Sequence, residues 1–156
     1  PNKYYNYDKK NIQHIFENLT SLAKKNDLQI ILIPSMRTPI GTIEYASKFF
    51  ADESIIIKNV DKKAYLSALS IAKFLVITCD STSMISEAAL TGKPIYVAKI
   101  LPKRDDFRFR QFRDLFTKLN IIRNLEDKLE VWNYEKLDET SRVAGIIKNK
   151  IKFNEI

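Results

Sequence analysis

The chain has 156 residues, of which 45% are hydrophobic and 29% charged, an ordinary composition for one folded domain without a membrane-spanning apolar stretch. Its single cysteine excludes an internal disulfide, and its single histidine leaves too few ligands for a conventional zinc site. The net charge of +7 favours an anionic partner, but it does not choose among phosphorylated small molecules, acidic lipids and nucleic acid.

The amino-terminal half of the chain predicts two helices that alternate with two strands. Apolar residues recur at three- and four-residue spacing from Tyr7 to Asn26, as on one face of a helix. The continuous apolar run Leu28–Ile33 is typical of a strand covered on both sides. Pro34–Pro39 is a loop with proline at both ends, Gly41–Ala51 predicts a short helix, and β-branched residues make Ser54–Lys58 the next strand.

The second half continues the alternation. Asp61 can cap a helix that runs to Ala72, and the apolar run Phe74–Thr78 follows as a third strand. Ser81–Thr91 predicts a helix with Gly92 at its C′ position. The remaining expected elements are a strand at Pro94–Ala98, a helix at Asp105–Leu119, a short strand at Ile121–Arg123 and a closing helix at Asp138–Lys150.

Strands that alternate with helices across short connections predict an α/β fold, a Rossmann-like three-layer sandwich with an open parallel sheet and helices on both faces. Ligands of such folds bind outside the carboxyl ends of the strands. Two polar loops, Pro34–Pro39 and Cys79–Ser83, each follow a predicted strand. We therefore expect these loops to lie on the same rim of the sheet.

The first of these loops contains an arginine. Arg37 lies between the two prolines, with Ser35 and Thr38 beside it. A guanidinium binds phosphate bidentately and keeps its charge at any physiological pH. The loop therefore predicts a phosphate contact through Arg37 and Ser35, and a surface arginine without a ligand is the alternative.

The second loop opens a helix with three small hydroxyl residues, Ser81, Thr82 and Ser83, followed by Met84. A helix N-terminus presents unpaired N–H groups and a partial positive charge, which together bind anions. Helix capping by Asp80 or Ser81 is the alternative, but capping requires only one such residue. The pattern favours a diphosphate held by Ser81 and the three residues that follow it.

Glu87 lies further along the same helix, about 9 Å from Ser81 along the axis. The residue three positions before Glu87 is Met84, so this carboxylate does not belong to a capping box. A ribose attached to phosphates at the helix tip would bring both its hydroxyls near such a carboxylate. Glu87 is thus a candidate ribose ligand, and a glutamate that only faces solvent is the alternative.

Four blocks of the chain, in this order, resemble a family of bacterial proteins of uncertain activity and the plant elongated-mitochondria fission factors. The blocks are SMRTP, DSTSMISEAALTGKP, RFRQF with the IIR that follows, and EVWNYEKLDET. That family is similar to the carboxyl-terminal half of GT-B glycosyltransferases, in which a serine-rich helix start holds the diphosphate of a nucleotide sugar and a glutamate holds its ribose. Ser81, Thr82, Ser83 and Glu87 match that pattern, whereas Met36 stands where family members tend to have another arginine.

The resemblance implies that residues 1–156 form one nucleotide-diphosphate-sugar-binding domain, the carboxyl-terminal part of a longer two-domain protein. It places the catalytic base in the amino-terminal domain, so the catalytic residues stay unknown. Neither a metal nor a cofactor is expected, since the nucleotide sugar is a substrate. A non-catalytic scaffold that recruits partners, as the plant members imply, is the alternative.

The stretch Lys103–Arg113 mixes basic and aromatic residues. Its aromatic residues have the spacing of one helical stripe, which predicts that Phe109, Phe112 and Phe116 face the core and leave a solvated basic face. Peripheral contact with an anionic membrane is the alternative, and nucleic acid is not expected as a partner. A cytoplasmic location follows from the unpaired cysteine, with the inner face of the membrane as the place of any peripheral contact.

His14 and Cys79 are the remaining candidates for chemistry. His14 lies within the first predicted helix, far in sequence from either polar loop, so a structural or surface role is expected. Cys79 ends a buried strand with no histidine near it in sequence, which favours packing over nucleophilic chemistry.

Overall fold

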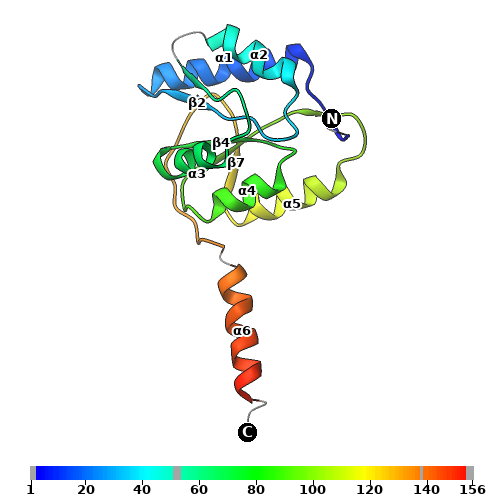
Figure 1. The fold of residues 1–156 in the computed structure, drawn as a ribbon, viewed down its shortest axis with the longest axis vertical. Coiled ribbons are helices and arrows are strands. Elements are labelled where there is room, and N and C mark those ends of the chain that lie inside the picture. The colour runs from blue at the N-terminus through cyan, green and yellow to red at the C-terminus, as the bar shows by residue number, and fades with distance from the viewer. Residues whose placement is uncertain (1–2, 51–53, 138, 154–156) are drawn as a thin grey trace.

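The computed structural model describes residues 3–50, 54–137 and 139–153. Its helices form two layers, one on each face of the parallel strands (Figure 1). One layer consists of α1 (Lys9–Lys25) and α2 (Ile40–Phe50). The opposite layer consists of α3 (Lys62–Ile71), α4 (Thr82–Ala89) and α5 (Phe107–Lys118).

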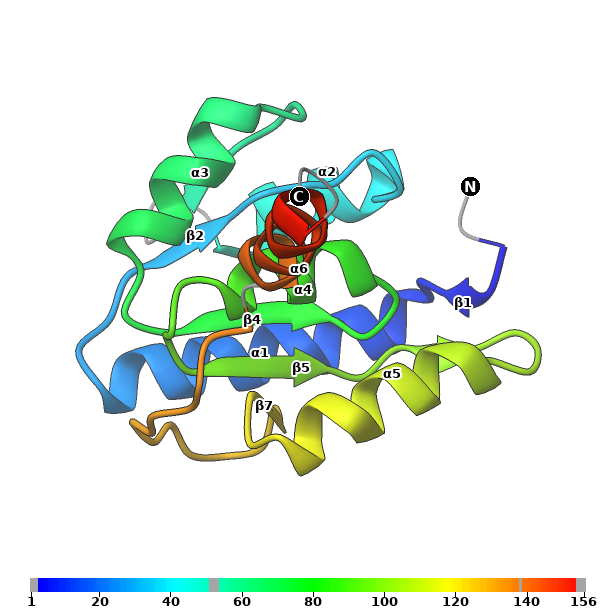
Figure 2. The same cartoon turned by 90° about the horizontal axis from the view of Figure 1, so that it is seen from below.

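The parallel strands form two ladders, as Figure 2 shows in part. The first ladder pairs β2 (Ile30–Leu32) with β3 (Ser54–Ile56). The second has β5 (Ile95–Ala98) at its centre, between β4 (Leu75–Thr78) and β7 (Ile122–Asn124). The predicted α/β sandwich with parallel strands is confirmed, although β2 and β4 do not pair to make the ladders one continuous sheet.

A short antiparallel ladder that the sequence pattern does not predict joins the start of the chain to the segment after β5. β1 (Tyr5–Asn6) pairs with β6 (Leu101–Pro102), and the Lys103 amide donates to the Tyr4 carbonyl at 2.7 Å. Two-residue strands are too short to show alternation in a sequence. The first helix consequently starts at Lys9 rather than Tyr7, with Asp8 as its N-cap.

Several helix ends differ from the expectation by one to three residues. α4 ends at Ala89 instead of Thr91, but Gly92 has a φ of 74°, so its predicted left-handed conformation is confirmed. α5 starts at Phe107 rather than Asp105. The last helix, α6 (Glu139–Phe153), extends away from the sandwich (Figure 1). Ala51 and Asp138, predicted as helix ends, lie outside the described residues.

The core lies between the helix layers and the strands. On one side, the Phe16 ring of α1 contacts Tyr45, Phe49 and Phe50 of α2 at centroid distances of 4.9 to 5.7 Å. On the other, the apolar face of α4 packs inward, with Ile85 fully buried. The predicted aromatic stripe of α5 also faces inward: Phe116 is buried, and Phe109 and Phe112 are half-buried.

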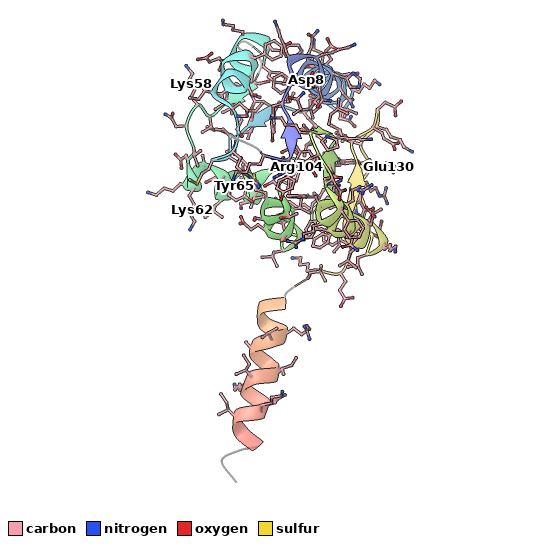
Figure 3. All side chains as sticks on the ribbon, turned by 90° about the vertical axis from the view of Figure 1, so that its right-hand side faces the viewer. Asp8, Lys58, Lys62, Tyr65, Arg104 and Glu130 are labelled. Atoms are coloured by element: carbon pink, nitrogen blue, oxygen red, sulfur yellow. The ribbon has the colours of Figure 1, made fainter. Side chains whose placement is uncertain are left out.

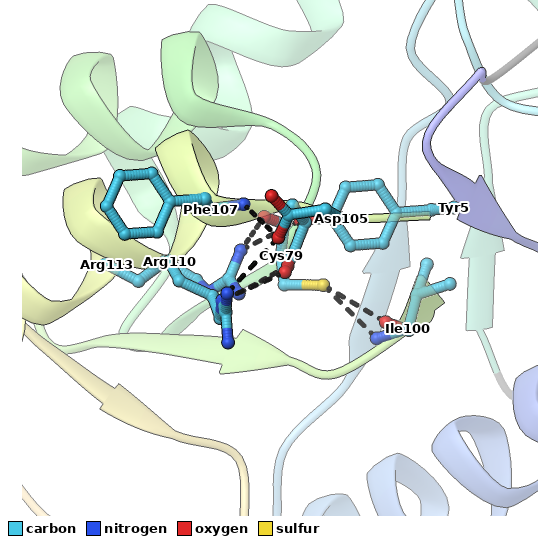
Figure 4. A network of polar contacts seen from close by, with 8 residues as sticks. Tyr5, Cys79, Ile100, Asp105, Phe107, Arg110 and Arg113 are labelled. Atoms are coloured by element: carbon cyan, nitrogen blue, oxygen red, sulfur yellow. Dashed lines mark hydrogen bonds and ion pairs between the residues drawn. The ribbon is translucent and has the colours of Figure 1, made fainter. Parts of the chain in front are cut away.

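A buried carboxylate ties α5 to β1. Asp106 accepts from the Tyr5 hydroxyl at 2.9 Å and pairs with Arg113 at 3.0 Å and Arg110 at 3.2 Å (Figure 4). Arg113 also donates to the Cys79 carbonyl at 3.0 Å, at the end of β4. The network therefore holds three chain segments together around one charge.

The charges around Asp106 determine its pKa. Burial by itself raises the pKa, but hydrogen bonds from Arg113 and Tyr5 and the charges of Arg113 and Arg110 outweigh it. The pKa of Asp106 is therefore lower than its ordinary value. A group with a lowered native pKa stabilises the fold above its unfolded-state pKa, and this contribution is lost as the pH falls through the native value.

Replacing Asp106 by alanine is expected to lower the free energy of unfolding by about 3 kcal/mol, because the largely buried Arg113 loses its counter-charge. The neighbouring Asp105→Ala is the matched control. Its side chain is 76% exposed and accepts from the Phe107 amide and Arg110, both at 3.2 Å, so the expected loss is about 1 kcal/mol or less. Urea unfolding at neutral pH measures both.

The same pair of variants tests the sign of the pH effect. The stability difference between the wild type and Asp106→Ala should be constant above about pH 5 and shrink only as the pH falls below about 4. Equal losses for the two variants, or a difference that grows in acid, would contradict the assignment of Asp106 as the buried charge.

Candidate functional site

The loop after β2 is a compact turn that presents Arg37. The Ser35 amide donates to the Thr38 hydroxyl at 2.9 Å, and the Thr38 amide donates to the Ser35 carbonyl at 3.0 Å. The Arg37 amide donates to the Ser35 hydroxyl at 3.3 Å. Ser35 is thus engaged within its own loop, whereas Arg37 is exposed beside Met36, which is 91% exposed.

The turn after β4 leads into α4 through Ser81. The Ser81 amide donates to the Thr78 carbonyl at 3.1 Å, and the Ser81 carbonyl accepts from the Ile85 amide at 3.1 Å, which starts the helix. Ser81 is the N-cap residue and is buried, but its side chain makes no capping hydrogen bond. The first turn of α4 also contains no acidic residue, so its positive end is not neutralised from within the helix.

The structure brings the two loops into direct contact. Arg37 Nη2 donates to Ser81 Oγ at 3.2 Å, across 44 positions of sequence. Arg37 therefore orients the Ser81 hydroxyl, which the sequence pattern assigns either to a helix cap or to a ligand. A guanidinium and the start of a helix, both attractive to anions, lie side by side on the rim at the carboxyl ends of the strands.

The rest of the predicted diphosphate set lies along the first turn of α4. Thr82 and Met84 are half-buried, and Met84 packs against the core. Ser83 is exposed. Of these three residues, the side chains of Thr82 and Ser83 carry hydroxyl groups, whereas Met84 can contribute only its backbone N–H.

The sequence pattern did not predict that Tyr7 belongs to this site. The Tyr7 hydroxyl donates to Asp80 Oδ1 at 3.0 Å and lies 3.5 Å from Thr78 Oγ1, so the segment before α1 crosses the carboxyl end of β4. Burial raises the pKa of Tyr7, and the Asp80 charge raises it further, which keeps the phenol protonated as a donor. The signal available in the sequence was the cluster of tyrosines ahead of the first helix.

Glu87 lies away from the Arg37–Ser81 contact, on the side of α4 that faces α3. It is exposed, and Tyr65 of α3 lies beside it. The Tyr65 hydroxyl is buried and has no hydrogen-bond partner of good geometry among the described residues. Burial raises the pKa of Tyr65, and the Glu87 carboxylate raises it further. Figure 3 shows Tyr65 on the inner side of α3, whereas Lys58 and Lys62 point outward.

A cleft opens beside this rim. It has a volume of about 410 Å³, lies between the start of α1 and the start of α2, and includes Tyr7, Pro39 and Tyr45 in its lining. Tyr7 is shared between the cleft and the Asp80 contact, and Pro39 ends the Arg37 loop. The volume is within the range of small-molecule sites.

The other candidates for chemistry lie elsewhere. His14 is exposed on α1. Cys79 is buried, and its Sγ accepts a hydrogen bond from the Ile100 amide. Burial raises the pKa of the Cys79 thiol, so Cys79 is a packing residue, as expected. Within the described ranges, no group of histidine, cysteine or carboxylate side chains has the arrangement of a metal site.

These features define the protein as a Rossmann-like α/β domain with two polar loops in contact at the carboxyl ends of its strands. Its sequence identifies the family. The profile of the mitochondrial fission ELM1 family matches residues 1–151, and the chain belongs to that family.

Two curated proteins illustrate the similarity. An uncharacterised protein of Rickettsia prowazekii is 30% identical over 165 residues, which cover 99% of this chain and 45% of that protein. Mitochondrial fission protein ELM1 of Arabidopsis thaliana is 28% identical over 138 residues, which cover 85% of this chain and 31% of that protein. The chain thus spans less than half the length of either relative. No solved structure matches it.

Among the helices of the described residues, none is both long enough and apolar enough to cross a bilayer.

The unusual N-cap of α4 can be tested against that of α3. Asp61 accepts from the amides of Lys63 at 2.8 Å and Ala64 at 3.0 Å, so Asp61→Ala should destabilise the protein by about 1 kcal/mol. Ser81→Ala should cost less than about half of that, because Ser81 makes no capping bond. Thermal unfolding of both variants measures the contrast, and equal losses would contradict the prediction.

Proposed function

We propose that this domain binds the diphosphate of a nucleotide sugar at the contact between Arg37 and Ser81, as the donor-binding half of a GT-B-like glycosyltransferase. The observation that carries the proposal is the 3.2 Å hydrogen bond between these residues at the start of α4. It places a permanent positive charge beside the positive end of a helix dipole. Two adjacent sources of positive potential suit the two phosphates of a nucleotide diphosphate.

The first turn of α4 supplies the remaining donors. In the proposed complex, the hydroxyls of Ser81, Thr82 and Ser83 and the backbone N–H of Met84 bind phosphate oxygens, and Ser35 holds the Arg37 backbone in place. Their combined charge stabilises a leaving diphosphate without requiring a metal ion.

Glu87 is assigned to the ribose. Its carboxylate is exposed, so it is accessible to a ligand, and it lies about 9 Å from Ser81 along α4. This spacing suits a nucleoside whose phosphates lie at the helix tip. Tyr65, whose buried hydroxyl lies next to Glu87, is a second polar group at the same place.

The transferase activity itself belongs to the whole protein in this proposal. The catalytic base and the acceptor site are assigned to an amino-terminal domain, in line with the GT-B resemblance and with relatives more than twice as long as the matched segment. A scaffold that recruits partners is the competing function, and it predicts no nucleotide affinity.

Two substitutions separate the phosphate role from the ribose role. Calorimetric titration with UDP-, GDP- and ADP-sugars should give saturable binding to at least one of them. Arg37→Ala should weaken binding of both that nucleotide sugar and inorganic pyrophosphate by at least about tenfold, or about 1.4 kcal/mol. Glu87→Ala should weaken binding of the nucleotide sugar by a similar factor but leave pyrophosphate affinity unchanged.

The matched controls are Arg108→Ala and Glu135→Ala, which remove the same charges from exposed positions elsewhere. Neither should change affinity by more than about twofold. Absence of binding to every nucleotide sugar would favour the scaffold, and loss of pyrophosphate binding in Glu87→Ala would refute the ribose assignment.

A second candidate function, contact with an anionic membrane, is favoured by one surface patch. Leu101 and Phe107 are 52% and 53% exposed, and the exposed basic residues Lys103, Arg104 and Arg108 surround them in sequence. Apolar side chains rimmed by positive charge suit the interface of an acidic bilayer.

Co-sedimentation with vesicles that contain phosphatidylserine tests the patch. The double variant Arg104→Glu/Arg108→Glu should lose binding by at least about tenfold, since each basic residue near the surface contributes about 1 kcal/mol. Lys58→Glu/Lys62→Glu changes the net charge equally at positions away from Arg104 (Figure 3) and should bind more tightly than the first variant. Equal binding by both variants would show that the net charge alone, and not this patch, accounts for vesicle binding.

A further inference from the structure

The cleft between the starts of α1 and α2 has no part in the site proposed above. Its volume of about 410 Å³ far exceeds the roughly 30 Å³ that one water molecule occupies, so it has room for a ligand. It is accessible from solvent, because Lys9, Glu44 and Lys48 in its lining are all exposed. Since it borders the Arg37–Ser81 contact, it is a candidate for a second part of the same ligand site.

The inner surface of the cleft is aromatic and aliphatic. Ile12 of α1 is buried, and the cleft is also lined by Tyr7 and Tyr45. The position of the Tyr45 ring is fixed by its neighbours: it stacks on Phe16 at 5.7 Å and contacts Phe49 at 5.8 Å between ring centroids. Preformed aromatic walls are typical of small-molecule sites and can pack against the C–H groups of a ring.

The edge of the cleft carries charges of both signs. Glu44 and Lys48 of α2 lie about one helical turn apart, and neither forms an ion pair with another of the described residues. Lys9 of α1 lies over the Tyr45 ring, with Nζ 5.6 Å from the ring centroid. A hydroxyl group can donate to a carboxylate and accept from an ammonium group, whereas a purely anionic ligand would be repelled by Glu44. The lining therefore suits an uncharged ring with several hydroxyl groups.

The position of the cleft indicates which part of a nucleotide sugar would enter it. Arg37 lies in the loop that leads into α2, and Ser81 starts α4, so their hydrogen bond joins the two helix layers on opposite faces of the strands (Figure 1). Glu87, the proposed ribose ligand, belongs to α4 in one layer, whereas the cleft belongs to the layer of α1 and α2. A nucleotide sugar has its nucleoside and its sugar at opposite ends of the diphosphate. With the nucleoside along α4, the sugar extends toward the cleft.

Two residues make the cleft continuous with the diphosphate contact. The Tyr7 hydroxyl donates to Asp80, directly before the Ser81 turn, and Tyr7 also lines the cleft. Pro39 ends the loop that presents Arg37, and it lines the cleft as well. A ligand group attached to phosphates at this contact would therefore reach the cleft directly.

We propose that the cleft holds the sugar residue of the nucleotide sugar, with Tyr45 against its ring and the Glu44 carboxylate accepting from its hydroxyls. The inference rests on the diphosphate site proposed at Arg37 and Ser81, and it adds the class of the group beyond the phosphates, an uncharged sugar ring. Residues at the start of α2 thereby determine which sugar the domain accepts.

Gly41 provides a way to fill the cleft. It belongs to the lining, and a Cβ at this position would meet no atom within 4 Å, so Gly41→Leu should occupy the cleft without disturbing the fold. Calorimetric titration of this variant should show at least about tenfold weaker binding of the nucleotide sugar, but unchanged binding of the corresponding nucleoside diphosphate, which lacks the sugar. Gly145→Leu is the matched control. A Cβ there would also meet no atom within 4 Å, but Gly145 lies on α6, so both affinities should stay unchanged.

Glu44→Gln tests the same site by a second route that leaves the backbone unaltered. Loss of the charged acceptor should weaken binding of the nucleotide sugar by at least about fivefold and leave the nucleoside diphosphate unaffected. Glu135→Gln makes the same change at an exposed position outside the cleft and should alter neither affinity.

Three results would overturn the proposal, and they separate it from the function on which it rests. Unchanged binding of the nucleotide sugar by Gly41→Leu would exclude the cleft but leave the diphosphate site intact. Equal weakening of the nucleotide sugar and the nucleoside diphosphate would assign the cleft to the nucleoside instead. Absence of all nucleotide binding by the wild type would refute the diphosphate site and the sugar site together.

Discussion

A hydrogen bond from Arg37 to Ser81 joins the ends of two ladders that share no strand pairing. The polar loops that follow β2 and β4 meet at the carboxyl ends of the strands, where ligands of such folds bind. Arg37 adds a positive charge to the rim, which the neutral hydroxyl of Ser81 could not supply. The candidate site depends on this meeting point.

The buried Asp106 network holds together the chain segments next to that rim. It anchors the start of α5, β1 and the carbonyl of Cys79 to one another, directly before the Ser81 turn. Buried ion pairs contribute little net stability compared with apolar packing, but removing one partner is costly because the other charge stays buried. Such a pair therefore specifies one arrangement of its segments, and here it holds the turn after β4 against α5.

Local patterns in the sequence determine the class of the fold and the identity of its loops. Apolar runs and helical periodicity locate the five longer strands and six helices of the described residues within a few positions, because strand and helix formation depend on neighbours close in sequence. The same patterns identify Arg37, Ser81 and Glu87 as candidates. Only the tertiary structure decided that Arg37 contacts Ser81, that Tyr7 crosses β4, and that Asp106 is buried among arginines. Each of these contacts joins residues distant in sequence, except those within α5, and no periodicity encodes which distant partners a folded chain brings together.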